Sequence, residues 1–289
     1  MGVSQSNETL METERRDDGV YYYARFDNEP FSSGACRFAY KGELLCNEKK
    51  RHKAKYNGLP IVVKVFKREY AKDYGAWNSD ISASKKANEY AILFNEKKFI
   101  DRVLSFPTPH VAKMETRAGF SFFGLTGYEY DLKTNPVGSS EYVAMEEYLT
   151  GKYIKFNSNN GYVNNAVNSS TMPAFSHWTF HQSDGQVLVC DLQGVLNDGN
   201  YRLTDPAIHS RVANTYGSTD LGVFGQARFF QTHQCNDICR GWKKLHLTDE
   251  IQTELSKVPT SVQTLFGIQV ASDVRTSENQ FSSLFMIEE

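Results

Sequence analysis

The sequence of 289 residues predicts an α+β fold, arranged either as one large domain or as two lobes with a shared cleft. Three observations support this fold class. β-rich runs fill residues 20–70, and apolar residues recur at near-helical spacing over residues 79–100. Shorter strand and helix patterns follow in the second part of the chain, where polar and metal-binding side chains gather between Phe175 and Cys239.

The composition excludes several classes of protein. Hydrophobic residues make up 40% of the chain and the net charge is −2, so the chain can build a core and lacks the basic excess typical of nucleic-acid-binding domains. No apolar run approaches the roughly 20 residues that span a bilayer. The N-terminus is polar, and the five cysteines are an odd number, which argues against a secreted disulfide framework. We therefore expect a reduced, cytoplasmic protein.

The first 19 residues are polar and acidic, and we expect a disordered tail there. Glycine at position 2 and serine at position 6 fit the N-myristoylation pattern, although a chance match in a flexible tail is the alternative. One myristoyl chain at Gly2 would hold a membrane only weakly. Arg15 and Arg16 are offset by Asp17 and Asp18, so this tail offers no polybasic second signal.

The first half of the chain reads as strands followed by a helix. Aromatic and β-branched residues predict strands at 20–26 and 37–40. Asn57-Gly58 marks a turn before an apolar run at 59–66, which is typical of a buried strand. Ser79 or Asp80 would cap the helix at 79–100.

The second half mixes both element types. The expected elements are a strand at 140–149, a loop at 153–170, a helix at 173–180, a strand at 186–195, a helix at 221–231 and a helix at 249–255.

Histidine and cysteine side chains indicate a zinc site. His233, Cys235 and Cys239 lie within seven residues, and the two cysteines stand one helical turn apart. Imidazole and thiolate are the natural ligands of tetrahedral zinc, and a closed structural site needs a fourth ligand. By sequence position that ligand is His177, His209 or His181. The alternative is a pair of buried free cysteines beside an incidental histidine.

Lys64 stands in the buried strand at 59–66 and needs an anionic partner, because an unpaired buried charge is costly. Phosphate oxygens would satisfy it, and so would a carboxylate such as Glu89 on the following helix. A strand lysine paired with a helix glutamate is the arrangement of protein kinases. The alternative is an edge lysine that reaches solvent.

Oxygen-bearing side chains indicate a metal–phosphate site. Asp191 ends an apolar strand, and Gln193 follows at the spacing that faces the same side of a strand. Carboxylate and amide oxygens suit Mg²⁺, and Asp205 in a Thr-Asp-Pro turn could hold a second metal position or accept a hydroxyl proton. The glycine-bearing run from Gly217 to Gly225 could bind phosphate or present a peptide substrate.

In these residues the chain resembles the atypical α-kinase family, which includes elongation factor 2 kinase and the myosin heavy chain kinases. The resemblance covers roughly residues 28–245. The motifs that carry it are Glu146–Tyr153, Asn157–Gly161, Phe175–Trp178, Asp191–Gly194, Leu203–Pro206 and His233–Cys239. It implies a bilobal kinase fold with a structural zinc in the C-terminal lobe, and a serine/threonine protein kinase that uses ATP, Mg²⁺ and Zn²⁺.

The resemblance also implies roles for individual residues. Asp191 would be the catalytic carboxylate, Gln193 and Asp205 would bind Mg²⁺, and His177 would be the fourth zinc ligand. Gly217, Gly222 and Gly225 would lie in a loop that contacts the protein substrate. The residues implied to contact the nucleotide are Lys64 and Arg37 at the phosphates, Glu146, Tyr148 and Leu149 at the adenine, and Asn159 in a neighbouring loop.

On this basis the catalytic domain is expected at 20–245, with lobes at 20–145 and 146–245, and a C-terminal tail at 246–289. The motifs of conventional kinases are absent from the sequence. The family's glycine-rich loop usually carries asparagine where this chain has Asp220, which is expected to add negative charge near the substrate. The competing hypotheses are a nucleotide-binding pseudokinase scaffold and a zinc-stapled interaction module without nucleotide chemistry.

Overall fold

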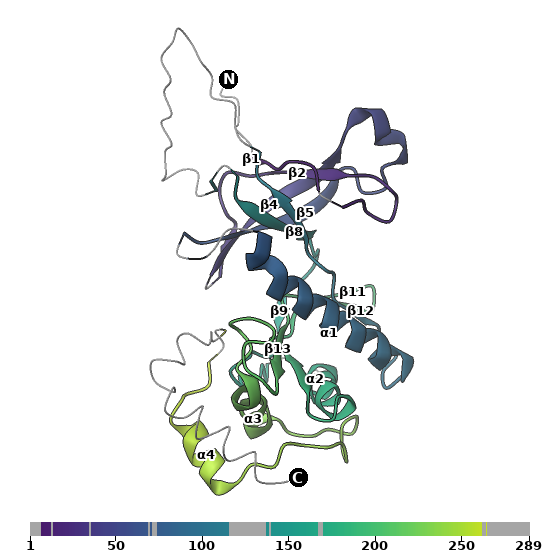
Figure 1. Ribbon diagram of the computed structural model, residues 1–289. Coiled ribbons are helices and arrows are strands. Elements are labelled where there is room, and N and C mark those ends of the chain that lie inside the picture. The colour runs from purple at the N-terminus through teal and green to yellow at the C-terminus, as the bar shows by residue number, and fades with distance from the viewer. Residues whose placement is uncertain are drawn as a thin grey trace. The chain divides into compact units, whose positions relative to one another are not determined.

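The computed structural model divides into two compact units, Met1–Asn78 with Thr108–Tyr148 and Ser79–Pro107 with Leu149–Glu289 (Figure 1). The residues that the structure describes are 7–12, 14–34, 36–68, 70, 74–115, 137–138, 140–166, 170–261 and 264. Gly2 and residues 265–289 of the expected C-terminal tail therefore lie outside the described residues.

The first unit is an antiparallel sheet in the order β1-β2-β4-β5-β8-β7, with β3 paired to β4. Its strands are β1 (Asn7–Glu8), β2 (Tyr22–Phe26), β3 (Ser32–Ser33), β4 (Arg37–Cys46), β5 (Leu59–Phe66), β7 (His110–Lys113) and β8 (Tyr142–Glu147). Two 3₁₀ turns, η1 (Glu48–Lys53) and η2 (Tyr74–Trp77), complete this unit.

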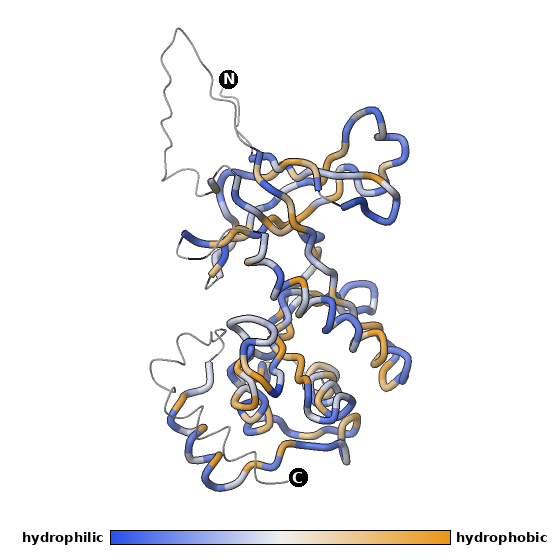
Figure 2. The backbone as a smooth tube through the Cα atoms, viewed as in Figure 1, coloured by the Kyte–Doolittle hydropathy of each residue, from blue (hydrophilic) through white to orange (hydrophobic). Residues whose placement is uncertain are grey.

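The core of the first unit lies on one face of this sheet. Alternate residues Ile61, Val63 and Val65 of β5 are buried against Val143 and Met145 of β8, as the twofold period of a strand requires. Figure 2 shows hydrophobic stretches along the strands and a hydrophilic turn at η1. The strand expected at 59–66 is confirmed with the same bounds.

The N-terminal segment closes this sheet. Thr9 pairs with β2 through its amide bond to the Ala24 carbonyl (3.0 Å), and on its other side it forms an antiparallel bridge with Met114. The amide of Leu10 donates to the Lys113 carbonyl at 2.7 Å. For residues 7–12 and 14–19, which the structure describes, this differs from the expectation of a disordered tail at residues 1–19. The segment shows no apolar periodicity because it is held by backbone pairing.

The second unit holds two small sheets. One has the order β6-β12-β11-β9, and the other is the antiparallel pair β10-β13. Their strands are β6 (Leu104–Ser105), β9 (Ile154–Lys155), β10 (Val187–Cys190), β11 (Gln193–Asn197), β12 (Asn200–Thr204) and β13 (Ala207–Ser210).

Four helices belong to the described part of this unit, namely α1 (Asn78–Glu96, which starts at the last residue of the first unit), α2 (Thr171–Gln182), α3 (Gly222–Thr232) and α4 (Asp249–Ser256). Ala91 and Phe94 of α1 pack in one core with Phe175 and Trp178 of α2. This packing explains why residues 79–107 cluster with the second unit, although they were expected in the N-terminal lobe. No helix among the described residues is long and apolar enough to cross a membrane.

The expected C-terminal tail begins with an ordered helix. Thr248 caps α4, since its hydroxyl accepts a bond from the Ile251 amide at 3.4 Å. Ile251 and Leu255 are buried against Leu221 and Phe224 at the start of α3. The domain therefore extends beyond residue 245.

Candidate functional site

Two aspartates of the second unit, Asp191 and Asp205, lie where the chain passes from one strand to the next. Asp191 lies between β10 and β11 with φ = 57°, and Asp205 lies between β12 and β13 with φ = 50°. Residues other than glycine rarely adopt this left-handed conformation, and such strain collects at functional sites. The single strand expected at 186–195 is therefore two strands in two different sheets, broken at Asp191.

Strand register brings the separated groups together. Cys190, the last residue of β10, pairs with Ala207, while Gln193, the first residue of β11, pairs with Thr204. Asp191 follows Cys190 and Asp205 follows Thr204 in the chain, so both carboxylates and the Gln193 amide lie where the β10–β13 pair and the β11–β12 hairpin meet.

Glycine at position 194 is required by this pairing. Its φ is 153°, and a Cβ there would lie 2.8 Å from Leu203 Cα and nearer still to the Arg202 carbonyl oxygen. Any side chain would push β11 away from β12. The glycine of the Asp-Leu-Gln-Gly motif therefore keeps Gln193 in register beside Asp205.

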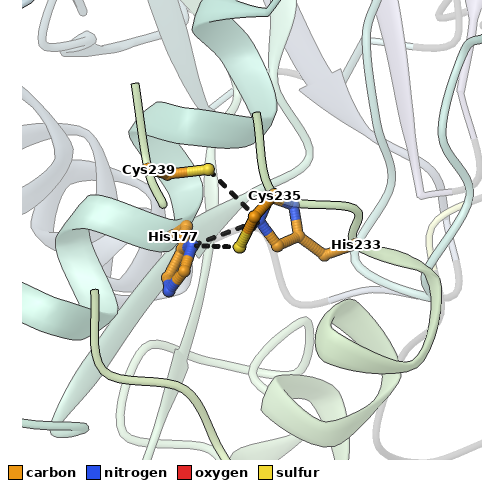
Figure 3. A group of neighbouring side chains, drawn as sticks. All are labelled: His177, His233, Cys235 and Cys239. Atoms are coloured by element: carbon orange, nitrogen blue, oxygen red, sulfur yellow. Dashed lines mark hydrogen bonds between the residues drawn. The ribbon is translucent and has the colours of Figure 1, made fainter. Parts of the chain in front are cut away.

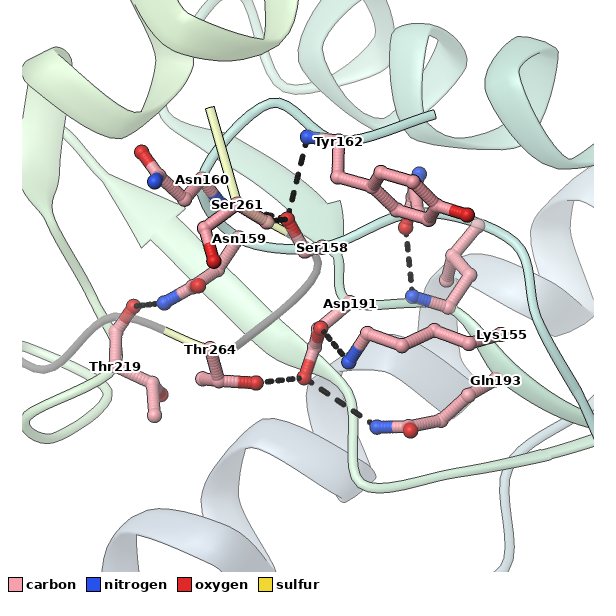
Figure 4. Close-up of polar contacts among 12 residues, drawn as sticks. Lys155, Ser158, Asn159, Asn160, Tyr162, Asp191, Gln193, Thr219, Ser261 and Thr264 are labelled. Carbon is pink, nitrogen blue, oxygen red and sulfur yellow. Dashed lines mark hydrogen bonds and ion pairs between the residues drawn. The ribbon is translucent and has the colours of Figure 1, made fainter. Parts of the chain in front are cut away.

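The Asp191 carboxylate is buried and holds three partners (Figure 4). Lys155 donates to Oδ1 at 2.6 Å, Thr264 Oγ1 donates to Oδ2 at 2.9 Å, and Gln193 Nε2 donates to Oδ2 at 3.3 Å. Burial raises the pKa of Asp191 above its ordinary value, and the Asp205 charge adds to this, while Lys155 opposes it. The result is a desolvated carboxylate with an elevated proton affinity.

Sequence reasoning assigned no role to Lys155 or Thr264. Lys155 reaches Asp191 because β9 pairs with β11, which sets Lys155 opposite Gln193. Thr264 arrives from the segment after α4, which is tied down where the Ser158 hydroxyl donates to the Ser261 carbonyl at 2.6 Å. No local pattern signals either contact, because the partners are 36 and 73 residues from Asp191 in sequence.

The asparagine-rich loop is bonded to the segment beside Asp191 and to β13. Asn157 Oδ1 accepts a bond from the Leu192 amide at 2.7 Å. Asn159 is buried, its amide donates to the Thr219 carbonyl at 3.0 Å, and its own carbonyl accepts from His209 Nε2 at 2.8 Å. These contacts link the loop to β13 and to the glycine-bearing segment; nucleotide contact by Asn159 stays a prediction.

Asp220 is fully buried, contrary to the expectation that it adds charge near the substrate. Oδ1 accepts bonds from the amides of Ser210 and Gly222, both at 2.9 Å. Oδ2 accepts from the Ser210 hydroxyl at 2.7 Å and from the Tyr216 amide at 3.2 Å. The carboxylate thus organises the loop from inside.

The three loop glycines occupy tight positions. Gly217 faces Ser79 of α1, Gly222 begins α3, and Gly225 lies within α3 against the His209 ring, where a Cβ would clash with three ring atoms. Gly222 and Gly225 are buried. Close packing accounts for both, and substrate contact by this loop stays a prediction.

In the first unit, Lys64 is buried and paired. Its Nζ lies 2.8 Å from Glu146 Oε1 on the neighbouring strand β8, and both residues are less than 10% exposed. The expected partner, Glu89, is instead bonded to Lys86 of its own helix at 2.7 Å. The carboxylate of Glu146 therefore compensates the lysine charge, and this residue was expected at the adenine.

A second cation stands on the same face of the sheet. Arg37 pairs with Phe66 on β5, two residues beyond Lys64, so the two basic side chains share one face. The Arg37 guanidinium lies over the rings of Phe66 (5.7 Å) and Trp77 (5.8 Å). Tyr148 and Leu149 follow directly after β8, and their adenine contact stays a prediction.

Four side chains form a compact cluster in the second unit (Figure 3). The ligand atoms of His177, His233, Cys235 and Cys239 all lie within 4.8 Å of one another. The closest separations are 3.1 Å between His233 Nε2 and His177 Nδ1, and 3.6 Å from His233 Nε2 to each sulfur. Tetrahedral zinc with N and S ligands has ligand-to-ligand distances of about 3.5 Å, so the cluster fits this ion.

Surrounding contacts prepare these groups as ligands. His177 Nε2 donates to the Lys243 carbonyl at 2.8 Å, which leaves the Nδ1 lone pair facing the cluster. Burial lowers the pKa of His233 to about 3 and lowers that of His177, so both imidazoles stay neutral. Burial raises the pKa of Cys239 to about 11, so a thiolate there needs a cation.

The other histidines considered as the fourth ligand lie elsewhere. His209 is bonded to the Asn159 carbonyl and the Leu221 amide, and the His181 ring is stacked on Trp242.

Comparison with known proteins agrees with this geometry. The family model described as "Alpha-kinase family" matches residues 32–239. Alpha-protein kinase vwkA of Dictyostelium discoideum is 32% identical over 226 residues, which is 76% of this chain and 30% of that protein. Eukaryotic elongation factor 2 kinase of Caenorhabditis elegans is 50% identical over 95 residues, 33% of this chain and 12% of that protein.

Solved structures show the same similarity. An alpha kinase from Entamoeba histolytica superposes with a TM-score of 0.64 at 25% identity, covering 92% of this chain and 99% of that one. An inactive alpha-kinase domain of myosin heavy chain kinase A in complex with ATP gives 0.63 at 25% identity, covering 84% and 99%. The chain spans less than a third of the length of the two curated relatives named above. By the extent of the family match and the identity to vwkA, it belongs to the alpha-kinase family.

Proposed function

We propose that this chain is a serine/threonine protein kinase that transfers the γ-phosphate of ATP to a hydroxyl of a protein substrate. The observation that carries the proposal is the buried Asp191 carboxylate, held by Lys155 and adjoined by Gln193 and Asp205. A desolvated carboxylate of raised pKa is suited to accept the proton of an attacking hydroxyl. The ATP-bound structure of a related domain supports the nucleotide.

The contact of Thr264 with Asp191 supports this role. An aliphatic hydroxyl donates to Oδ2 at 2.9 Å, which is the approach that a serine or threonine substrate would need. Lys155 on Oδ1 orients the carboxylate and favours its ionised form, while the bond from Thr264 shows that Oδ2 can accept an aliphatic hydroxyl.

Gln193 and Asp205 would hold Mg²⁺, because they bring an amide and a carboxylate oxygen to the same strand ends. When bound, Mg²⁺ would neutralise phosphate charge during transfer. Lys64 and Arg37 share one face of the sheet in the first unit and would contact the phosphates. The Glu146 carboxylate beside Lys64 fixes the ammonium group in place.

Zinc would serve as a structural ion in this proposal. Its four protein ligands would be His177, His233, Cys235 and Cys239, which leave no open position for substrate. These residues connect α2 to the segment after α3, so the ion would join two parts of the second unit that are far apart in sequence.

A radiolabelled ATP assay on a generic basic protein tests the kinase proposal. Lys64→Met and Asp205→Asn should each reduce incorporation by about a hundredfold or more, because each removes a charge on which phosphate or metal binding depends. Lys85→Met, an exposed lysine on α1, is the matched control and should stay active. Near-normal activity in both site variants would contradict the proposal. A nucleotide-binding scaffold would be favoured by loss of Lys64, Asp191 or Asp205, and all three are present.

A further inference from the structure

The chain that follows α4 is bonded to the asparagine-rich loop. We call its described residues, 257–261 and 264, the strap. Asn160 Nδ2 donates to the Pro259 carbonyl at 3.0 Å. The Ser158 hydroxyl donates to the Ser261 carbonyl at 2.6 Å (Figure 4). These two bonds hold the strap against the loop at positions two residues apart.

The helix before the strap is joined to the same loop. The buried Arg228 donates through Nη1 to the Leu255 carbonyl at 2.9 Å and through Nε to Asn160 Oδ1 at 3.1 Å. Leu255 itself lies in the core that α3 and α4 share. The strap therefore begins at a fixed position on the second unit.

Thr264 of the strap occupies the carboxylate of Asp191. The Thr264 hydroxyl donates to Oδ2 at 2.9 Å, and Gln193 Nε2 donates to the same oxygen at 3.3 Å (Figure 4). Lys155 donates to the other oxygen, Oδ1, at 2.6 Å. Because Asp191 is only 3% exposed, an incoming hydroxyl can reach Oδ2 only after the strap has moved.

The strap itself adds little to the core of the second unit. Lys257, Pro259 and Thr260 are exposed, and the other described strap residues are partly exposed. Its contacts with the loop and with Asp191 are hydrogen bonds, which water or a bound substrate can replace. Segments with few buried apolar contacts open at low free-energy cost. The strap can therefore leave Asp191 while the fold stays intact.

We propose that the strap is an intramolecular competitor of the protein substrate. The Thr264 hydroxyl occupies the acceptor position at Asp191 until a protein substrate displaces it. A group tethered by a short segment acts at an effective concentration on the order of millimolar. A substrate must therefore bind through contacts beyond its acceptor hydroxyl, which makes the strap a filter against weakly bound proteins. This inference rests on the proposed kinase function, since it assigns the regulation of the same carboxylate.

Steady-state kinetics of the full chain, with ATP and myelin basic protein, test the proposal. Thr264→Val keeps the shape of the side chain and removes the hydroxyl. The KM for the basic protein should fall by about tenfold or more, because one hydrogen bond to a charged group is lost and apparent affinity rises with the open fraction. The kcat and the KM for ATP should stay unchanged. Thr264→Glu should lower the same KM, because like charges repel.

The matched control is Thr260→Val, an exposed threonine four residues earlier in the strap, which should keep the wild-type KM. A second measurement needs no phosphate transfer. Fluorescein-labelled myelin basic protein, titrated without ATP and followed by fluorescence anisotropy, should bind Thr264→Val about tenfold more tightly than it binds the wild-type chain.

Three results would each overturn the competition. One is an unchanged KM and unchanged binding in both Thr264 variants. Another is a lower kcat of Thr264→Val with no change in KM, which would make Thr264 a positioning residue for Asp191. The third is complete phosphorylation of Thr264 on incubation with ATP alone, which would make its hydroxyl an acceptor. By contrast, chains that transfer no phosphate would contradict the kinase function, and tighter binding by Thr264→Val would still support the strap.

Discussion

Lys155 Nζ lies 2.6 Å from Asp191 Oδ1, across the pairing of β9 with β11. Burial raises the pKa of this carboxyl, and the positive charge of the ammonium group lowers it. Asp191 must be ionised to accept a proton, so kinase activity should fall as the pH drops through its pKa.

Replacing Lys155 with methionine should therefore move the acidic limb of the pH–rate profile to higher pH. Without the ammonium group, nothing from this partner lowers the pKa of Asp191, whereas burial and the Asp205 charge still raise it. Activity at pH 6 should fall by more than activity at pH 8. The control is Lys152→Met, an exposed lysine three residues earlier. An equal fractional loss at every pH would show that Lys155 acts in some other way.

Asp220→Asn should destabilise the protein and leave peptide preference unchanged. The carboxylate accepts four bonds in a fully buried position, and an amide nitrogen would face at least one donor there. The expected loss in the free energy of unfolding is about 1–3 kcal/mol. Urea denaturation measures it, with the exposed Asp198→Asn as control. A stable variant with altered preference for charged peptides would contradict the structural role.

Purified protein should contain about one zinc per chain, the number expected of one closed four-ligand site. His177→Ala and Cys239→Ser should lower the melting temperature strongly, because a structural metal contributes folding free energy. The exposed His246→Ala serves as the control and should retain both metal and stability. Elemental analysis and thermal melting with and without chelator check this. Metal-free wild-type protein with an unchanged melting temperature would count against zinc.

Removing residues 1–19 should lower the melting temperature clearly, whereas removing residues 1–6 should not. The longer deletion removes β1 and the Thr9 contacts with Ala24 and Met114, while the shorter one keeps them. Backbone pairing on both sides of a strand stabilises a sheet and covers its edges. Differential scanning fluorimetry of the two truncated chains decides it. Equal melting temperatures would show that closure of the sheet adds little stability.

Local patterns were sufficient for elements whose signal is contained within the element. The apolar run at 59–66, bounded by Asn57-Gly58, predicted β5 with its bounds. The helix expected at 221–231 is α3, shifted by one residue. Spacing also identified three of the clustered His and Cys groups, and the family resemblance supplied His177, which the structure brings beside them.

Long-range partners could not be predicted in this way. Glu146 meets Lys64 across 82 residues, Lys155 meets Asp191 across 36, and Thr264 meets it across 73. Each contact depends on the register of paired strands or on how a distant segment is anchored. A short stretch of sequence contains no information about either. Asp220 was misread for the same reason, since its burial follows from packing against β13.

The bridge between Thr9 and Met114 also sets an order of assembly. The segment around Thr9 has to wait for residues 110–114 before both of its edges are paired, and β8 follows later still. Residues 79–107, which belong to the second unit, are made in the interval. Pairings this distant in sequence are slow to form, and an unpaired strand is prone to aggregate meanwhile. Until residues 110–114 have been synthesised, the segment around Thr9 therefore keeps one edge unpaired.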